Sequence, residues 1–259
     1  MMITVREVEQ VLFDWAPKEL AAEWDNVGHL VGEPEAEVKK VLIALDITEA
    51  VVNEAVTCGA DLIVAHHPVM NCAWHPVQRV RSDDTQGRML ITMIRNGISA
   101  ICMHTNLDAA DGGVNDALAE KLGLTDLEVL NEEKIGRIGT LKSQLPLVEF
   151  TRFVIKSLGC NGLRYVDNGK PVHRVAVGGG ACSGYIAQAI AKGCDTFVTS
   201  DLKYNDFLDT KEINLVDAGH FPTENVVCPV VAAYLRKKFP ELTVIHSTEH
   251  SSEVIQYCI

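Results

Sequence analysis

Histidines and carboxylates follow three predicted strands at the points where those strands end. The strands are expected over 61–65, 98–103 and 213–219. The side chains that come next are, in pairs, His66 with His67, His104 with Asp108, and His220 with Glu224. Ligands of open α/β sheets bind beyond the carboxyl ends of the strands, so we expect these side chains to converge on one crevice. Imidazole together with carboxylate suits Zn, Fe, Mn, Co or Ni better than Mg or Ca.

The adjacent pair His66 and His67 favours two metal ions over one. Neighbouring side chains on an extended backbone point to opposite sides, so the two imidazoles would not readily bind the same ion. A carboxylate can bridge a pair of metals, and two-metal sites hold their ions about 3.5–4 Å apart. A dinuclear site is therefore the economical interpretation.

Structural explanations exist for each pair taken alone. An acid such as Glu224 is favoured in the first turn of a helix, and Asp108 could serve as a turn or cap residue. Asp25 could belong to a helix-end turn or reach a polar site, and spacing does not decide. The repetition at three strand ends favours the metal site. The remaining histidines considered are interpreted as loop residues hydrogen-bonded to backbone: His75, His173, His246 and His250.

Strand-like and helix-like segments alternate along the chain, which predicts parallel sheets covered by helices. Thr4 with Glu7 forms a capping box ahead of a helix that runs to about Trp15. Further strands are predicted over 41–47, 136–143, 173–177, 195–201, 242–247 and 253–258. Further helices are predicted over 49–58, 83–97, 112–123, 146–158, 185–193 and 222–239. The glycine-rich stretch 178–184 is interpreted as a tight turn between strand and helix.

Composition excludes several classes of protein. The 259 residues carry a net charge of −12, and 47% are hydrophobic, so the chain is neither disordered nor built to grip nucleic acid. No apolar stretch approaches the ~18 residues that a membrane span needs. The first 15 residues lack a basic stretch followed by an apolar run, so no secretory signal is expected. The eight cysteines contain no C-x-x-C, which favours reduced thiols and a cytoplasmic location.

The least regular stretch of the sequence, about 125–170, is a plausible junction between two α/β lobes. We predict an N-terminal lobe over 1–130 and a C-terminal lobe over 131–259, which together form one compact body.

Six segments of the chain, in order, resemble the signature blocks of the Nif-three-like family. Members of this family are commonly called GTP cyclohydrolase 1 type 2 homologues. The segments are WDNVGHLVG (24–32), ALDIT (44–48), DLIVAHHPVM (61–70), HTNLDAADGGVNDALAEKLGL (104–124), SDLKYND (200–206) and DAGHFPTE (217–224). The resemblance runs from residue 24 to the C-terminus, and its histidine-containing blocks are highly specific.

The resemblance implies two similar α/β lobes, with helix-covered sheets, around a central cleft that holds a dinuclear metal centre. It assigns the ligands of two divalent ions (Zn, Fe or Mn) to His66, His67, Asp108, His220 and Glu224. It also implies a ring-shaped homohexamer whose metal sites face an interior cavity. Some relatives carry an extra domain between the lobes, and 125–170 is too short to hold it, so the chain resembles the compact form.

The activity that the resemblance implies is a metal-dependent hydrolase of the GTP cyclohydrolase 1 type 2 kind. Its substrate would be a nucleotide or a related small metabolite, with neither nucleic acid nor membrane as partner. Metal-activated water would attack the substrate. His104 would shuttle protons, or equally orient a ligand by a hydrogen bond. Lys203 and Tyr204 are candidates for contact with an anionic substrate.

The segment 200–206 departs from the family pattern. Ser200 and Asn205 stand where relatives often have Gly and His, which weakens any acid–base role at position 205. This departure, together with the absence of a nucleotide-binding motif, favours one alternative, a metal-binding or regulatory oligomer without turnover. A metal-dependent phosphoesterase is a second alternative.

Overall fold

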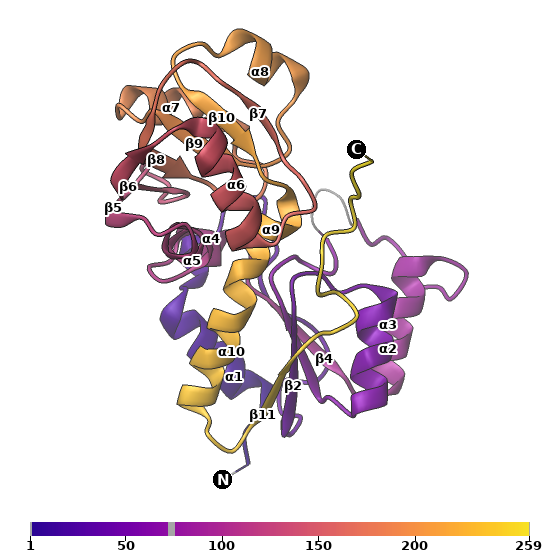
Figure 1. Cartoon of the computed structure of the whole chain (residues 1–259). Coiled ribbons are helices and arrows are strands. Elements are labelled where there is room, and N and C mark those ends of the chain that lie inside the picture. The colour runs from indigo at the N-terminus through magenta and orange to yellow at the C-terminus, as the bar shows by residue number, and fades with distance from the viewer. Residues whose placement is uncertain (1, 72–75, 259) are drawn as a thin grey trace. The chain divides into compact units, whose positions relative to one another are not determined.

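A computed structural model describes residues 2–71 and 76–258, which form two compact units (Figure 1). The first unit contains the chain up to Ala110 together with Cys228–Ser251, and the second contains Asp111–Val227 and the chain from Ser252 onward. These boundaries differ from the predicted lobes 1–130 and 131–259 in two places. Residues 111–130 belong to the second unit, and Cys228–Ser251 belongs to the first, whose sheet receives the late strand Thr243–His246. His75 and Cys72 lie outside the described residues.

The sheet of the first unit has five strands in the order β1-β4-β3-β2-β11. β11, β2, β3 and β4 are parallel to one another, and β1 pairs antiparallel with β4 at one edge. The strands are β1 (Gly28–Val31), β2 (Lys40–Ala44), β3 (Leu62–Ala65), β4 (Ser99–Cys102) and β11 (Thr243–His246).

Helices cover both faces of this sheet (Figure 1). The central strands β2, β3 and β4 are buried almost throughout, and their sequences are largely apolar, as is typical of parallel strands covered on both faces. One face, which includes Leu42, Ile63 and Ala100, packs against α2 and α3. The helices of this unit are α1 (Val5–Trp15), α2 (Glu49–Cys58), α3 (Thr85–Arg95), the short α4 (Thr105–Ala109), α10 (Cys228–Lys238) and the 3₁₀ turn η1 (Lys18–Leu20).

The sheet of the second unit has six strands in the order β5-β6-β8-β9-β10-β7. β8, β9 and β10 are parallel, and the outer pairs are antiparallel. The strands are β5 (Thr125–Val129), β6 (Arg137–Leu145), β7 (Arg164–Val166), β8 (Val172–Val177), β9 (Thr196–Thr199) and β10 (Asn214–Asp217).

Alternation along the strands divides the core of the second unit into two layers. Val198 and its same-face neighbours pack with α5 and α6, whereas Phe197 on the opposite face packs with α7 and α8. The helical segments are α5 (Val114–Lys121), α6 (Leu147–Leu158), η2 (Ser183–Tyr185), α7 (Ile186–Ala191), α8 (Tyr204–Asp209), α9 (His220–Glu224) and η3 (Asn225–Val227).

The mixed α/β fold predicted from the sequence is confirmed, and so are several local signals. Thr4 and Glu7 form the capping box of α1, and Thr48 caps α2. Two predictions were wrong. The helix expected over 222–239 is broken into α9, η3 and α10, and 253–258 forms no strand. β1, β5 and β7 were not predicted, because short edge strands have weak apolar patterns.

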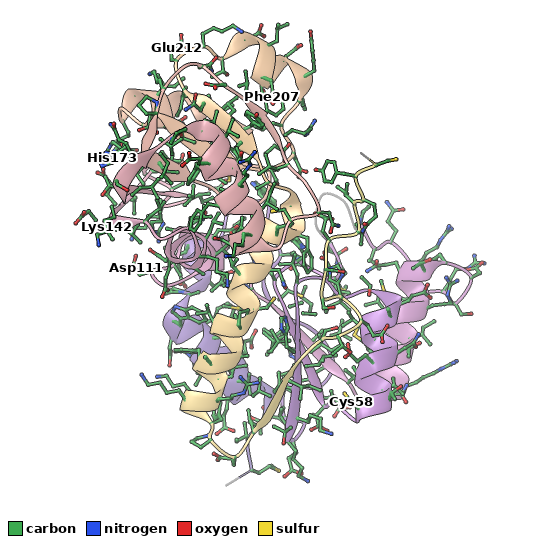
Figure 2. All side chains as sticks on the ribbon, viewed as in Figure 1. Cys58, Asp111, Lys142, His173, Phe207 and Glu212 are labelled. Carbon is green, nitrogen blue, oxygen red and sulfur yellow. The ribbon has the colours of Figure 1, made fainter. Side chains whose placement is uncertain are left out.

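Cys58, at the end of α2 (Figure 2), and three further cysteines outside the candidate site form no disulfide: Cys160, Cys194 and Cys258. Burial raises the pKa of the Cys160 and Cys194 thiols to about 11, so both are protonated at neutral pH. In the described part of the chain, no helix has the length and apolar character that crossing a bilayer demands.

Gly32 fixes how β1 approaches β4. Its φ is +107°, and a Cβ there would lie 2.8 Å from the Ser99 Cα and 2.2 Å from the Ser99 Oγ. Because backbone must shift, we expect Gly32→Ala to lower the free energy of unfolding by about 2–4 kcal/mol. Gly59→Ala is the matched control, since Gly59 also has a positive φ (+65°) but open space around it. We expect about 1 kcal/mol there. Urea unfolding measures both, and equal losses would contradict the close approach.

Candidate metal centre

The parallel strands of the first unit end at the same level. Ala44 pairs with Ala65, and Ala65 pairs with Cys102, so β2, β3 and β4 stop in register. The residues that follow therefore lie at one edge of the sheet. They include Asp46, His66, His67 and His104. Two of the three predicted pairs therefore follow strands of this sheet: the pair at 66 and 67 follows β3, and the pair at 104 and 108 follows β4. The third pair follows β10 of the other sheet.

The backbone at His66 and His67 is bent and not extended. Both backbone N–H groups donate to the carbonyl oxygen of Leu45, at 3.1 and 3.0 Å. The two ring centroids are consequently only 5.0 Å apart. The expectation that these side chains point to opposite sides was wrong, because β3 ends at Ala65 and alternation ends with it.

Each of the three histidines in this group uses its Nδ1 for a hydrogen bond inside the protein. Nδ1 of His66 donates to the carbonyl oxygen of Met103 at 2.8 Å. Nδ1 of His67 contacts Asp46 at 2.7 Å, and Nδ1 of His104 contacts Asp25 at 2.9 Å. Hydrogen bonds of this kind fix the tautomer and direct the lone pair of Nε2 away from the acceptor, as in metal-binding histidines.

His66, His67 and His104 form a compact cluster of imidazoles. One candidate ligand atom of each lies within 4.8 Å of the others. Asp108 joins the cluster, with its Oδ1 at 3.6 Å from Nε2 of His66. α4 positions this carboxylate, since the Asp108 N–H donates to the His104 carbonyl oxygen at 3.0 Å. This cluster could hold a metal ion.

Asp25 anchors the segment that carries His104 and Asp108. Besides His104, its carboxylate accepts hydrogen bonds from the backbone N–H and the hydroxyl of Thr105. Burial disfavours the charged form, yet the bonds from His104 and Thr105 lower the pKa of Asp25 to about 2. The carboxylate is therefore ionised at neutral pH, and the His104 Nδ1 must be the donor.

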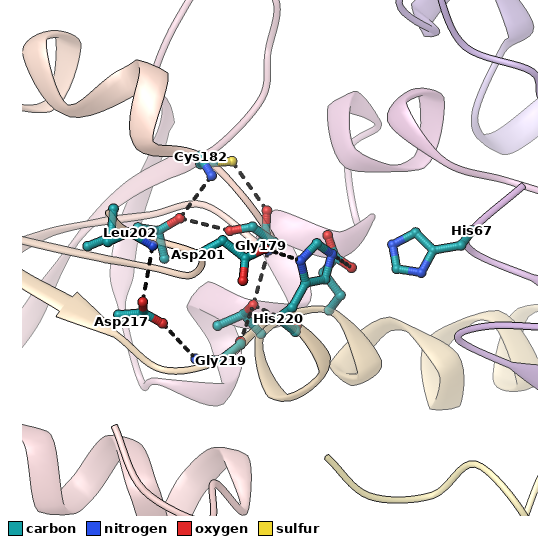
Figure 3. Close-up of polar contacts among 12 residues, drawn as sticks. His67, Gly179, Cys182, Asp201, Leu202, Asp217, Gly219 and His220 are labelled. Carbon is teal, nitrogen blue, oxygen red and sulfur yellow. Dashed lines mark hydrogen bonds and ion pairs between the residues drawn. The ribbon is translucent and has the colours of Figure 1, made fainter. Parts of the chain in front are cut away.

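His220 and Glu224 form the corresponding group in the second unit. β8, β9 and β10 are again in register, and His220 follows β10 as the first residue of α9. Nδ1 of His220 contacts the Asp201 carboxylate at 2.6 Å (Figure 3), and its Nε2 lies 3.0 Å from Oε2 of Glu224. Asp201 reaches this position with a φ of +56°, a conformation that aspartate tolerates better than most residues.

The His220 ring carries a proton in the metal-free protein. Burial opposes the charge, but the bonds with Asp201 and Glu224 raise the pKa of His220 to about 11. The proton on Nε2 points at the Glu224 carboxylate, so two candidate ligand atoms already face each other. A cation that bound both atoms would displace this proton.

Gly180 supplies the space that Glu224 occupies. A Cβ at this position would lie 2.1 Å from Oε1 of Glu224 and 3.1 Å from Nε2 of His220. The Gly180 N–H donates to the Thr223 hydroxyl at 3.0 Å, and its carbonyl accepts from Ser200 and Thr199. The glycine turn predicted as purely structural therefore also cradles a candidate ligand.

The substrate contacts suggested by the sequence lie on the surface. Tyr204 is 74% exposed, and Lys203 and Asn205 are exposed as well. Two residues that hold candidate histidines were missed, Asp46 and Asp201, and Asp25 was left undecided. The interpretation of His250 as a loop histidine bonded to backbone was wrong for its ring, whose Nε2 lies 2.7 Å from Oδ2 of Asp46. Asp46 could have been found, because it follows β2 at the same sheet edge as His66 and His104.

Two α/β units whose parallel strand ends carry buried histidines and carboxylates define a candidate metal-binding protein. The chain belongs to the family described as Duf34/NIF3 (NGG1p interacting factor 3), whose model matches residues 3–253.

Similar proteins extend over most of the chain. It is 34% identical over 229 residues to a Clostridium perfringens protein named GTP cyclohydrolase 1 type 2 homolog, covering 85% of this chain and 86% of that one. A Lactococcus lactis protein of the same name is 34% identical over 245 residues, covering 92% and 93%. The crystal structure of a Bacillus cereus protein related to NIF3 has a TM-score of 0.91 and 26% identity, covering 99% of this chain and 100% of that one.

The low pKa of Asp25 predicts a pH-dependent contribution to stability. A folded-state pKa of about 2, below the ordinary 3.8, stabilises the fold above pH ~4, and the effect is lost as the pH falls through 2. We expect Asp25→Asn to cost about 2 kcal/mol near pH 6 and roughly half of that at pH 3. Urea unfolding of both metal-free proteins at the two pH values measures this. A cost that does not change with pH would contradict it.

The cradle at Gly180 predicts a metal-binding defect in Gly180→Ala. The added methyl must displace Glu224, so we expect Zn²⁺ affinity to fall by about 10–100-fold in a competition titration with a chromophoric chelator. Gly184→Ala is the control in the adjoining 3₁₀ turn η2, because nothing lies within 4 Å of a Cβ at that position. Wild-type affinity in Gly180→Ala would show that Glu224 need not stay where it is.

Proposed function

We propose that the protein is a dinuclear metal-dependent hydrolase. The first unit would contribute His66, His67 and Asp108, and the second would contribute His220 and Glu224. The donor groups described above could hold a metal ion, and the proposal adds that two ions bind. Two divalent ions of the Zn, Fe or Mn type suit this imidazole and carboxylate set.

One observation carries the proposal: the candidate histidine ligands share a single hydrogen-bonding pattern. Nδ1 contacts a backbone carbonyl in His66, Asp46 in His67 and Asp201 in His220. If these histidines served packing alone, there would be no reason for Nδ1 to be the nitrogen that bonds to the protein in all three. Such orientation of Nε2 is the usual support for a metal ligand.

The chemistry that bound divalent ions supply is the acidification of water toward a neutral pKa, which provides hydroxide for hydrolysis. The residues of the chain would orient the ions and manage protons. His104 lies among the imidazoles with its Nδ1 held by Asp25, so Nε2 is the nitrogen that would accept or deliver a proton.

We propose a nucleotide or a related small metabolite as the substrate. The relatives named GTP cyclohydrolase 1 type 2 homolog support this choice by their name. A net charge of −12 supports a small molecule over a nucleic acid. The ring-shaped homohexamer is also part of the proposal, and the exposed edge strand β5, with Leu127 40% exposed, is the kind of surface that an assembly covers.

An activity screen with defined metals tests the proposal. Protein loaded with Mn, Zn or Fe is incubated with GTP, other nucleotides and phosphoesters. We expect hydrolysis that falls by ~100-fold or more in His67→Ala and in Glu224→Ala, because each removes a ligand. His173→Ala is the control, since this histidine of β8 (Figure 2) is not among the candidate ligands.

Metal content provides the second measurement of the same experiment. We expect two ions per chain at saturation, and clearly fewer would contradict the dinuclear centre. Turnover that survives in both ligand variants would contradict the mechanism. Two bound ions without turnover of any substrate would favour the metal-binding or regulatory alternative, and turnover of phosphoesters without GTP would favour a phosphoesterase.

A further inference from the structure

The Asp46 carboxylate holds two histidines at once. Its Oδ1 lies 2.7 Å from Nδ1 of His67, and its Oδ2 lies 2.7 Å from Nε2 of His250. The three residues follow three neighbouring parallel strands, because β2 lies between β3 and β11. His250 therefore contacts the carboxylate oxygen of Asp46 that His67 does not use, although it is 204 positions away from Asp46 in the sequence.

Each oxygen of the Asp46 carboxylate faces one ring nitrogen at 2.7 Å, so both histidines donate to it. An ionised carboxylate accepts and does not donate. His67 is consequently the Nδ1–H tautomer, with the lone pair on Nε2.

The segment that carries His250 is anchored separately from Asp46. Glu54 of α2 accepts hydrogen bonds from the Ser247 hydroxyl and from the backbone N–H of Thr248, at 2.5 and 2.9 Å. The Ser247 hydroxyl accepts in turn from the backbone N–H of His250 at 3.2 Å. The side chain of His250 is 11% exposed, whereas that of Asp46 is 39% exposed. The His250 imidazole is therefore held in place by its own segment, and its hydrogen bond restrains the more exposed Asp46 carboxylate.

We propose that His250 is a positioning residue for His67 and acts through Asp46. With the second donor removed, the half-exposed carboxylate is able to rotate and to bond water. The Nδ1–H of His67 then loses its fixed acceptor, and Nε2 loses its direction toward a metal ion. This inference rests on the proposed role of His67 as a metal ligand.

Two amide variants of the full-length protein separate positioning from general packing. In His250→Gln the amide nitrogen stands about where Nε2 stood, so the bond to Asp46 is kept. In His250→Asn the amide is too short to reach. By competition with a chromophoric chelator, we expect Zn²⁺ affinity to fall about 10-fold in the Asn variant and to stay within about 3-fold of wild type in the Gln variant.

The ring of His67 gives a second readout that packing alone would not change. Nitrogen-15 NMR of the metal-free protein should show the Nδ1–H tautomer of His67 in wild type and in His250→Gln, and a mixture of tautomers in His250→Asn. Equal affinities in both variants, or an unchanged His67 tautomer in His250→Asn, would overturn the inference.

His67→Ala in the same titration separates this inference from the proposed function. Wild-type Zn²⁺ affinity in His67→Ala would mean that His67 is not a ligand, and the proposed metal centre would fail. A loss in His67→Ala with wild-type behaviour in His250→Asn would overturn the role of His250 alone. His173→Asn controls for the loss of an unrelated histidine.

Discussion

Parallel strands that stop at the same level force the residues after them to crowd at one edge of the sheet, and the candidate donors of both units depend on this constraint. In the first unit the register of Ala44, Ala65 and Cys102 sets it, and in the second the pairing of Thr199 with Asp217 does. A slip of one residue would move a strand end by about 3.3 Å relative to its neighbour and would draw the donors apart.

The hydrogen bonds that make these buried histidines tolerable also orient them. A polar ring removed from water needs partners, and a carboxylate that is wholly or partly removed from water needs donors. Asp25 and Asp46 each meet this need with a histidine, and the low pKa of both carboxyls reflects it. The same bond fixes which nitrogen keeps its lone pair. Stability and readiness to bind a cation thus come from one set of contacts, so neither can be changed without the other.

Features that depend on neighbouring residues in the sequence could be predicted from it. Capping by Thr4 and Thr48, and the placement of His66 and His104 after strands, follow from neighbouring residues. The bend that turns His66 and His67 to the same side depends on the carbonyl of Leu45, which follows β2, and the alternation pattern of β3 contains no information about this contact. His250 could not be predicted, because its partner Asp46 is brought near by the pairing of β11 with β2.

Three of the residues discussed lie close in sequence to the boundaries of the two units. The chain passes between the two units after Ala110, after Val227 and after Ser251. Asp108, Glu224 and His250 each stand within three residues of one of these crossings. Each of these residues is nevertheless held by contacts inside its own unit. The Asp108 N–H donates to the His104 carbonyl oxygen, Glu224 lies 3.0 Å from Nε2 of His220, and His250 contacts Asp46. A candidate donor close to a unit boundary therefore still takes its position from the sheet edge of the unit to which it belongs.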